Sequence, residues 1–189
     1  MFTTEERKQM KPLHKRKEQQ PLIWTHAKTF QRAFELRTAE DVYATLCWEQ
    51  DWHSPARAEV AGDGWTFQRS GENHPSILVS RPGRAVEVAR LDLTGPGTAL
   101  LACREGQNYH WEYGTDEAGS VFGAWKSAEG QPILTFQVVS LLTADMGVAI
   151  ASTWHDLPEL SLLITLGWYL TRIHAEDDGR TTSGLFEGE

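Results

Sequence analysis

The sequence lacks an apolar stretch long enough to cross a membrane. Its strongest candidate lies between Glu159 and Arg172 and contains 12 uncharged residues. At about 1.5 Å per residue these residues span about 18 Å, whereas the hydrocarbon core of a bilayer is about 30 Å thick. We therefore expect no transmembrane span, and we expect this segment to be a buried helix.

Cysteine is scarce, and positive charge is not in excess. The two cysteines, Cys47 and Cys103, are too few for a disulfide scaffold, so we expect buried free thiols. A formal net charge of −8 argues against nucleic-acid binding, which needs a basic surface. The N-terminus is charged and has no apolar signal region. We therefore expect a cytoplasmic protein, with peripheral membrane contact as a further option.

Catalytic signatures are also missing. The sequence has no G-x-S-x-G elbow, phosphate-binding loop, G-x-G-x-x-G, C-x-x-C or H-E-x-x-H motif. Three histidines, His53, His110 and His155, have a tryptophan beside them, and a metal site would require all three to converge. Isolated histidines in β proteins are more often hydrogen-bonding rim or core residues. We predict no catalytic residue, no cofactor and no metal site.

What the sequence does contain is a long series of short strand patterns. Apolar and polar residues alternate with period two around 42–48, 64–69 and 108–113, which is typical of half-buried strands. Gly- and Pro-containing turns separate the patterns at short intervals. The predicted strands are 30–37, 42–48, 54–60, 64–69, 76–81, 85–93, 98–103, 108–113, 120–126, 133–139 and 146–151.

One helix follows these strands, and its dimensions constrain the fold. Residues 157–174 are apolar on every side, so the helix must be surrounded by protein. About eleven or twelve antiparallel strands leave a lumen wide enough for a helix of about 10 Å diameter, and both helix and strands are about 25 Å long. We predict a mainly β fold, a closed antiparallel barrel of about 12 strands around a central hydrophobic C-terminal helix. A two-sheet sandwich covered by the helix is the alternative.

The expected organisation is one domain with two tails. Residues 1–20 are polar and charged and are expected to form a flexible basic arm. Residues 21–174 form the barrel domain with its helix, and residues 175–189 form an acidic flexible tail. Asp156 and Glu159 have capping-box spacing, and Pro158 suits a first helical turn.

The order and character of several segments resemble the tubby-like barrel superfamily, which includes tubby C-terminal domains, LURP-one-related proteins and phospholipid scramblases. The resemblance spans residues 30–174 and rests on four strand segments and one helix. These are GWTFQR, ILVSRPGRAVEVARLDL, YHWEY, GAWKSAEGQPILTFQV and the final LPELSLLITLGWYL. It implies a twelve-stranded barrel around a central hydrophobic helix, in agreement with the length argument.

The functional implications of this resemblance are limited. Tubby domains bind phosphoinositide headgroups through a basic patch, and only Arg81, Arg84 and Arg90 form a loose group of that kind here. Scramblases carry an acidic, calcium-binding-like segment before the last helix, where this chain offers Asp145 and Asp156. Calcium requires six to eight oxygen ligands, so two acids do not predict a site.

Two further groups are candidate contact sites. An aromatic-rich segment at a strand end offers two tryptophans and two acids for a ligand cleft: Trp48, Glu49, Asp51 and Trp52. Clustered cations in the arm could tether the chain to anionic lipid or to an acidic partner protein. They are Arg7, Lys8, Lys11, Lys15, Arg16 and Lys17.

These features favour a non-catalytic binding or scaffolding module of the tubby-like type, acting on membrane phospholipid or a partner protein. The alternative is a small-molecule enzyme with its site at a barrel mouth, using scattered His, Asp and Glu residues. A third option is self-association through exposed tryptophans. Composition, motifs and spacing do not identify the ligand or the oligomeric state.

Overall fold

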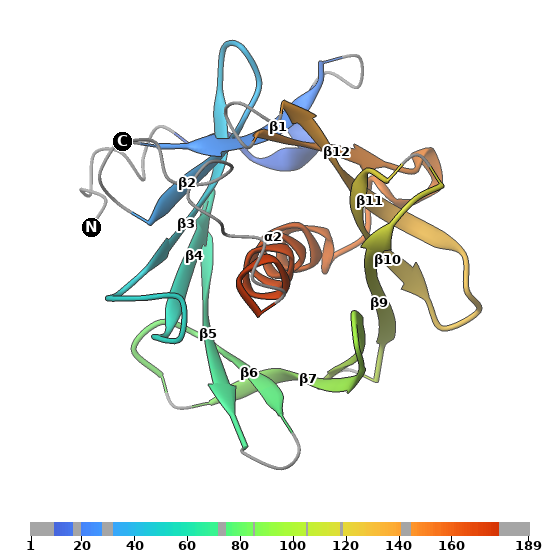
Figure 1. Ribbon diagram of the computed structural model, residues 1–189. Helices are drawn as coiled ribbons and strands as arrows, with labels where there is room; N and C mark the ends of the chain where they lie inside the picture. Colours follow the sequence, from blue (N-terminus) through green and yellow to red (C-terminus); the bar gives the residue numbers. More distant parts are fainter. Residues whose placement is uncertain are drawn as a thin grey trace.

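The computed structural model describes residues 10–16, 20–27, 32–71, 75–84, 86–104, 106–117, 119–140 and 145–177. Within these residues twelve strands form a closed antiparallel barrel, shown end-on in Figure 1. The strands are β1 (Leu22–His26), β2 (Ala33–Arg37), β3 (Val42–Trp48), β4 (Ala56–Val60), β5 (Asp63–Ser70), β6 (Ser76–Ser80), β7 (Glu87–Gly95), β8 (Thr98–Cys103), β9 (Asn108–Thr115), β10 (Val121–Ser127), β11 (Pro132–Ser140) and β12 (Asp145–Ile150).

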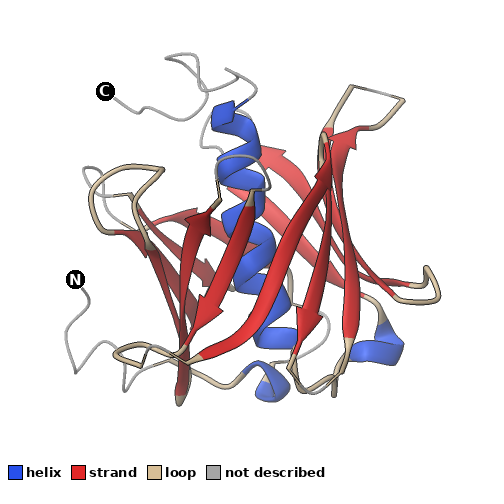
Figure 2. Cartoon of the chain, turned by 90° about the horizontal axis from the view of Figure 1, so that it is seen from below, coloured by secondary structure: helices blue, strands red, loops and turns tan. Residues whose placement is uncertain are grey.

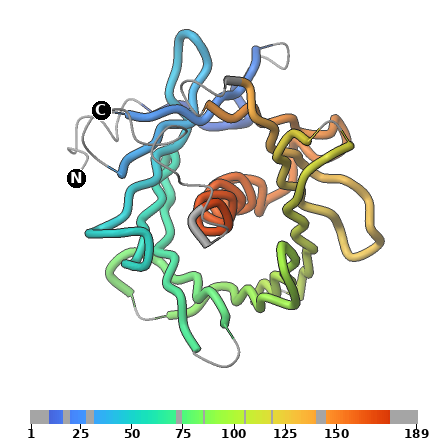
Figure 3. Tube along the Cα trace, viewed as in Figure 1, coloured from blue at the N-terminus to red at the C-terminus, as the bar shows by residue number. Residues whose placement is uncertain are grey.

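Each strand pairs with its neighbours in the sequence, and β1 pairs with β12 to complete the ring. This closure is visible in Figure 3, where the first strand lies beside the orange last strand. The closed ring confirms the predicted barrel and excludes the sandwich. Strand β1 was not among the predicted strands, because five residues between Pro21 and Ala27 are too short to show a clear alternation. Its Leu22 and Trp24 nevertheless point inward and are fully buried.

Several strands alternate as the period-two pattern predicts, and β3 is an informative exception. In β9, Tyr109 and Trp111 are buried while Asn108 and His110 are exposed. In β3, the outward-facing Tyr43 and Thr45 are buried as well. The N-terminal segment explains part of this burial, since the Lys11 amide donates a hydrogen bond of 3.0 Å to the Val42 carbonyl and Met10 is buried.

The helix α2 (Leu160–Asp177) runs along the barrel axis, as Figures 1 and 2 both show. Leu163, Ile164, Leu166, Tyr169 and Leu170 have no exposed surface, although they lie on different sides of the helix. The predicted central hydrophobic helix is therefore confirmed. In the described part of the chain, no helix has both the length and the apolar character that a membrane crossing requires.

Helix α2 begins at Leu160, three residues later than expected, and continues to Asp177. Two tight turns precede it, because the Leu157 amide bonds to the Trp154 carbonyl and the Leu160 amide bonds to the Leu157 carbonyl. The short helix η2 (Ser152–Trp154) and these turns lead the chain from β12 onto the axis. The Glu159 carboxylate does not take part in the expected capping box. It accepts a hydrogen bond from the Tyr109 hydroxyl at 3.1 Å.

One side of α2 lies very close to the wall formed by β10 and β11. The Trp125 indole N–H donates to the Leu163 carbonyl at 2.8 Å. A Cβ atom on Gly167 would collide with the Phe136 ring and lie 2.7 Å from Trp125 Nε1. Glycine at position 167 is therefore what allows the helix backbone to approach the two aromatic rings.

Candidate functional site at the barrel mouth

The two mouths of the barrel differ. At the mouth where α2 begins, short helical segments lie across the opening (Figure 2). Leu13 of the helix η1 (Leu13–Lys15), together with Trp154 and Leu157, packs against the core. At the opposite mouth α2 ends, near the connections that follow β3 and β7. Arginine, histidine and aromatic side chains gather there, so we consider this end as the candidate functional site.

One side of this mouth carries an aromatic–arginine cluster, which consists of Arg32, Phe34, Trp48, Trp52 and Arg172. The Arg172 guanidinium lies 4.4 Å from the Trp52 ring centroid and 5.2 Å from that of Phe34. Arg32 lies 5.4 Å from the same Trp52 ring. Trp48 and Trp52 meet edge to face at 4.7 Å. Cation–π contacts of this kind contribute about 0.5–2 kcal/mol each, depending on desolvation.

The connection between β3 and β4 holds Trp52 in place. The Asp51 carboxylate accepts hydrogen bonds from the amides of His53 and Ser54 at 2.9 and 2.8 Å. This is the local turn that Asp favours, because its side chain can bond the backbone two or three residues ahead. The Arg32 guanidinium also donates to the Gln50 carbonyl. The predicted aromatic cleft is therefore packed by its own side chains around Arg172.

The four residues predicted for that cleft thus occupy different environments. Trp48 is buried, and its ring stacks on Tyr169 of α2 with centroids 5.6 Å apart. Trp52 is half-buried over Arg172. Glu49 is exposed, and the Asp51 carboxylate accepts a backbone hydrogen bond in the β3–β4 connection. The structure brings the two tryptophan rings into contact, and the two acids are not part of that ring contact.

The other side of the same mouth contains a cavity of about 500 Å³, which we call the mouth cavity. Its wall includes Arg69, Leu93, Tyr113 and His174, together with the turn that joins β7 to β8. The His174 and Tyr113 rings stack with centroids 4.9 Å apart and an interplanar angle of 17°. A helix turns by about 100° per residue, so Arg172 and His174 project to opposite sides of α2. This places one of them in the aromatic–arginine cluster and the other at the cavity.

The β7–β8 turn beside the mouth cavity does not tolerate a side chain at Gly97. Gly97 has a positive φ of 71°, and a Cβ atom there would collide with the Tyr113 carbonyl oxygen. The Tyr113 amide donates to the Gly97 carbonyl at 2.7 Å. The turn and the end of β9 therefore form one fixed edge of the cavity.

The three arginines predicted as a ligand-binding group lie directly after β6, in the turn that follows it, and on β7. Arg81 forms an ion pair with Asp63 and stands 5.5 Å from the Trp65 ring. Arg90 pairs with Glu87 at 3.0 Å, and Glu87 raises its pKa. Arg84 is exposed in the turn after β6. Two of the three arginines are thus each bound to an acid on the barrel surface.

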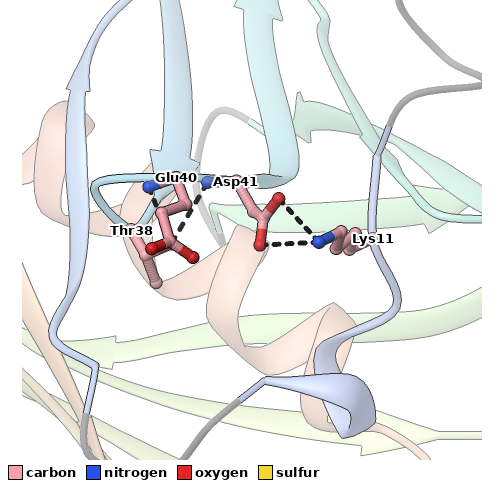
Figure 4. Close-up of polar contacts among 4 residues, drawn as sticks. All are labelled: Lys11, Thr38, Glu40 and Asp41. Atoms are coloured by element: carbon pink, nitrogen blue, oxygen red, sulfur yellow. Dashed lines mark hydrogen bonds and ion pairs between the residues drawn. The ribbon is translucent and has the colours of Figure 1, made fainter.

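The arm cations can be placed only in part. Arg7, Lys8 and Lys17 lie outside the described residues. Lys11 forms an ion pair with Asp41 at 2.9 Å, beside the turn that Thr38 stabilises (Figure 4). The Asp41 carboxylate raises the pKa of Lys11. Lys15 is exposed, and the Arg16 guanidinium donates to the Gln20 carbonyl at 2.6 Å.

The three histidines considered as metal ligands lie in separate places. His53 is in the β3–β4 connection, His110 is on the outer face of β9, and His155 follows η2 at the other mouth. His110 borders a surface recess of about 340 Å³ that also contains the ion pair between Lys126 and Glu112. Among the described residues, no three His, Cys, Asp or Glu side chains are close enough together to hold a metal ion.

Burial changes the titration of several groups near the core. Burial and the adjacent Glu159 carboxylate raise the pKa of Tyr109 far above its usual range. Burial raises the pKa of the Cys47 thiol, which is free and half-buried. Cys103 is also a free, half-buried thiol. At the mouth, desolvation and the charge of Arg172 lower the pKa of His26.

Five residues at this mouth were not predicted from the sequence as site residues: Arg32, Arg69, Tyr113, Arg172 and His174. A usable signal existed for Arg69, since it continues the inward-facing series of Trp65 and Phe67 by one more step of two. Tyr113 likewise continues the series of Tyr109 and Trp111. The residues at the helix end gave no such signal, because their partners come from distant strands.

Comparisons of this chain with protein-family models, with curated proteins and with solved structures found no match.

Proposed function

We propose that this chain is a non-catalytic binding module of the tubby-like type that associates with anionic membrane phospholipid. The observation that carries the proposal is the position of α2. Barrels that hold a small substrate or ligand do so in their lumen, and here a largely buried helix occupies that volume. Recognition is therefore expected at the mouths and on the outer surface. The twelve-stranded barrel around a hydrophobic helix is also what the tubby-like resemblance implies.

Support for an anionic membrane comes from the charge of the N-terminal segment. Six cations and no acid lie between Arg7 and Lys17, in a chain whose net charge is −8. Cations near an anionic bilayer surface contribute about 1 kcal/mol each to binding. Lys11 is already paired with Asp41, so Lys15 and the neighbouring cations are the better candidates for lipid contact.

Sedimentation with vesicles tests this proposal. The full chain should sediment with phosphatidylcholine vesicles that contain phosphatidylserine, and not with phosphatidylcholine alone. The double variant Lys15→Gln/Lys17→Gln should bind about 30-fold more weakly, because two cations contribute about 2 kcal/mol. Lys11 and Arg16 are retained in this variant, because both make contacts within the fold.

The control is Arg84→Gln/Arg104→Gln, which makes the same change in net charge at two exposed turns of the barrel. This variant should bind like the full chain. If both variants weaken vesicle binding equally, net charge alone determines binding. The N-terminal cations then have no specific role in lipid contact. An absence of sedimentation with either type of vesicle would refute lipid association and would leave a partner protein as the ligand to be sought.

A further inference from the structure

We infer that residues 10–16, which we call the strap, lie across the mouth where α2 begins and open without unfolding of the barrel. The ion pair between Lys11 and Asp41 holds the strap closed, and an anionic membrane surface favours the open form. The membrane step rests on the proposed function, whereas the closed strap and its opening do not.

The strap contacts the barrel in three ways. Met10 is buried, and Leu13 packs against the hydrophobic core. The Lys11 amide donates a hydrogen bond of 3.0 Å to the Val42 carbonyl at the start of β3. The Lys11 ammonium lies 2.9 Å from both carboxylate oxygens of Asp41, in the turn between β2 and β3 (Figure 4). These contacts hold the strap against the mouth.

The barrel is complete without the strap. Its ring closes through the pairing of β1 with β12, and the strap contributes no strand to it. Apart from Met10, every residue of the strap is exposed or half-buried. The short helix η1 is closed by a bond within the strap, from the Arg16 amide to the Leu13 carbonyl at 3.0 Å. Segments with few buried apolar contacts open at a lower free energy than the core, so the strap is expected to open while the barrel stays folded.

The Lys11–Asp41 ion pair is placed to control this opening. The Thr38 hydroxyl accepts a hydrogen bond from the Asp41 amide at 3.2 Å, so the turn that carries the carboxylate is fixed. The Asp41 carboxylate raises the pKa of Lys11. The pair is also accessible from solution, since the Lys11 side chain is 55% exposed. Salt weakens exposed ion pairs of this kind, and other anions compete for the same ammonium.

The composition of the strap explains why an anionic bilayer favours its release. Met10 and Leu13 are apolar and lie three residues apart, and Lys11 and Lys15 carry positive charge. In water, the two apolar side chains favour the closed strap. At an anionic bilayer, lipid phosphates replace Asp41 as the partner of Lys11, and the apolar side chains transfer into the membrane interface.

Hydrogen exchange of the Lys11 amide tests the strap without lipid. In the wild type this amide should be protected, and it should exchange through a local opening that does not depend on urea. Asp41→Asn removes the charge opposite Lys11 and should speed this exchange about twofold to fivefold, the range expected for an exposed ion pair. Added salt should speed exchange in the wild type and have little effect in Asp41→Asn.

Glu49→Gln is the matched control, because it removes one negative charge from an exposed residue directly after β3, at the other mouth. This variant should leave the exchange of the Lys11 amide unchanged. The strap is refuted if the Lys11 amide exchanges only with global unfolding, if it exchanges without protection, or if Asp41→Asn and Glu49→Gln have equal effects on it.

Vesicle sedimentation tests the membrane step. Asp41→Asn should bind phosphatidylserine-containing vesicles about twofold to fivefold more tightly than Glu49→Gln, because a larger fraction of its straps is open. Equal affinities would show that the strap stays closed on the membrane and would overturn this step alone. If no vesicle binds, the proposed function and the membrane step both fail, and the exchange of the Lys11 amide still decides whether the strap opens.

Discussion

Tyr109 connects the barrel wall to the start of the central helix. Its ring is buried in the core, and its hydroxyl donates to the Glu159 carboxylate at 3.1 Å. Glu159 immediately precedes α2, so this bond fixes where the chain enters the barrel axis. The bond also explains why Glu159 is not available for the capping box that its spacing predicts.

Replacement of Tyr109 by Phe should reveal this connection as a change in pH dependence. Because burial and Glu159 raise the pKa of Tyr109 above its ordinary value of 10.0 in the folded protein, the phenol ionises at lower pH in the unfolded state than in the folded state. The contribution of Tyr109 to the free energy of unfolding is therefore fully present below about pH 10 and is lost as the pH rises above that value. Urea unfolding should show a smaller alkaline loss of stability for Tyr109→Phe than for the wild type.

At neutral pH the same variant should lose about 0.5–1.5 kcal/mol of unfolding free energy, the net value of one hydrogen bond. Tyr43→Phe, which also removes the hydroxyl of a buried tyrosine, is the matched control for the loss of one buried hydroxyl. Equal slopes against pH for the wild type and Tyr109→Phe would contradict the raised pKa that burial and Glu159 give to Tyr109.

At the scale of single residues, sequence patterns predict facing direction well and contacts poorly. The alternation in β9 correctly predicts that Trp111 is buried and that His110 is exposed. The same patterns could not show that Arg172 meets Trp52, because these residues are 120 positions apart and meet only when the barrel closes. The candidate site consists mainly of such distant pairs, so most of it could not be predicted.

Among the secondary-structure elements, α2 is the one whose exact placement matters most. Its Gly167 allows the backbone to lie against Phe136 and Trp125, and the Trp125 indole bonds to the Leu163 carbonyl. Glycine in a helix interior normally costs about 1 kcal/mol relative to alanine. Its presence here indicates that the close approach outweighs that cost.

Gly167→Ala should therefore destabilise the protein by about 1–3 kcal/mol, the usual cost of overpacking a core. The sign of this change in unfolding free energy is informative, because helix propensity alone predicts that Gly167→Ala stabilises the protein by about 1 kcal/mol. Chemical unfolding of this variant should be compared with that of Ser161→Ala, a partly exposed position on the same helix. A Gly167→Ala protein more stable than the wild type would mean that the helix is not held against this wall.

The elements also show where prediction from the sequence is limited. Strands β3 and β8 have the predicted bounds, since each is set off by turn residues and has a regular pattern. Strand β1 has no such pattern, and its existence follows only from the need to close the ring between β2 and β12. The turns before α2 form because the chain must pass from the wall onto the axis, a constraint that local sequence does not express.

On the scale of the whole molecule, the barrel and the helix depend on each other. The ring could be anticipated because an all-apolar helix must be enclosed, and a twelve-stranded barrel has a lumen of the right width. The filled lumen directs recognition to the surface. Of the two mouths, the one at the end of α2 has both the mouth cavity and the aromatic–arginine cluster.

Native-state hydrogen exchange tests most directly whether α2 is the core of the barrel. We predict that the amides of Leu163–Leu170 are among the slowest to exchange and open only with global unfolding. Their free energy of opening should equal the unfolding free energy from urea titration and fall with the same dependence on urea. Exchange of these amides through a local, urea-independent opening several kcal/mol below global unfolding would contradict the account.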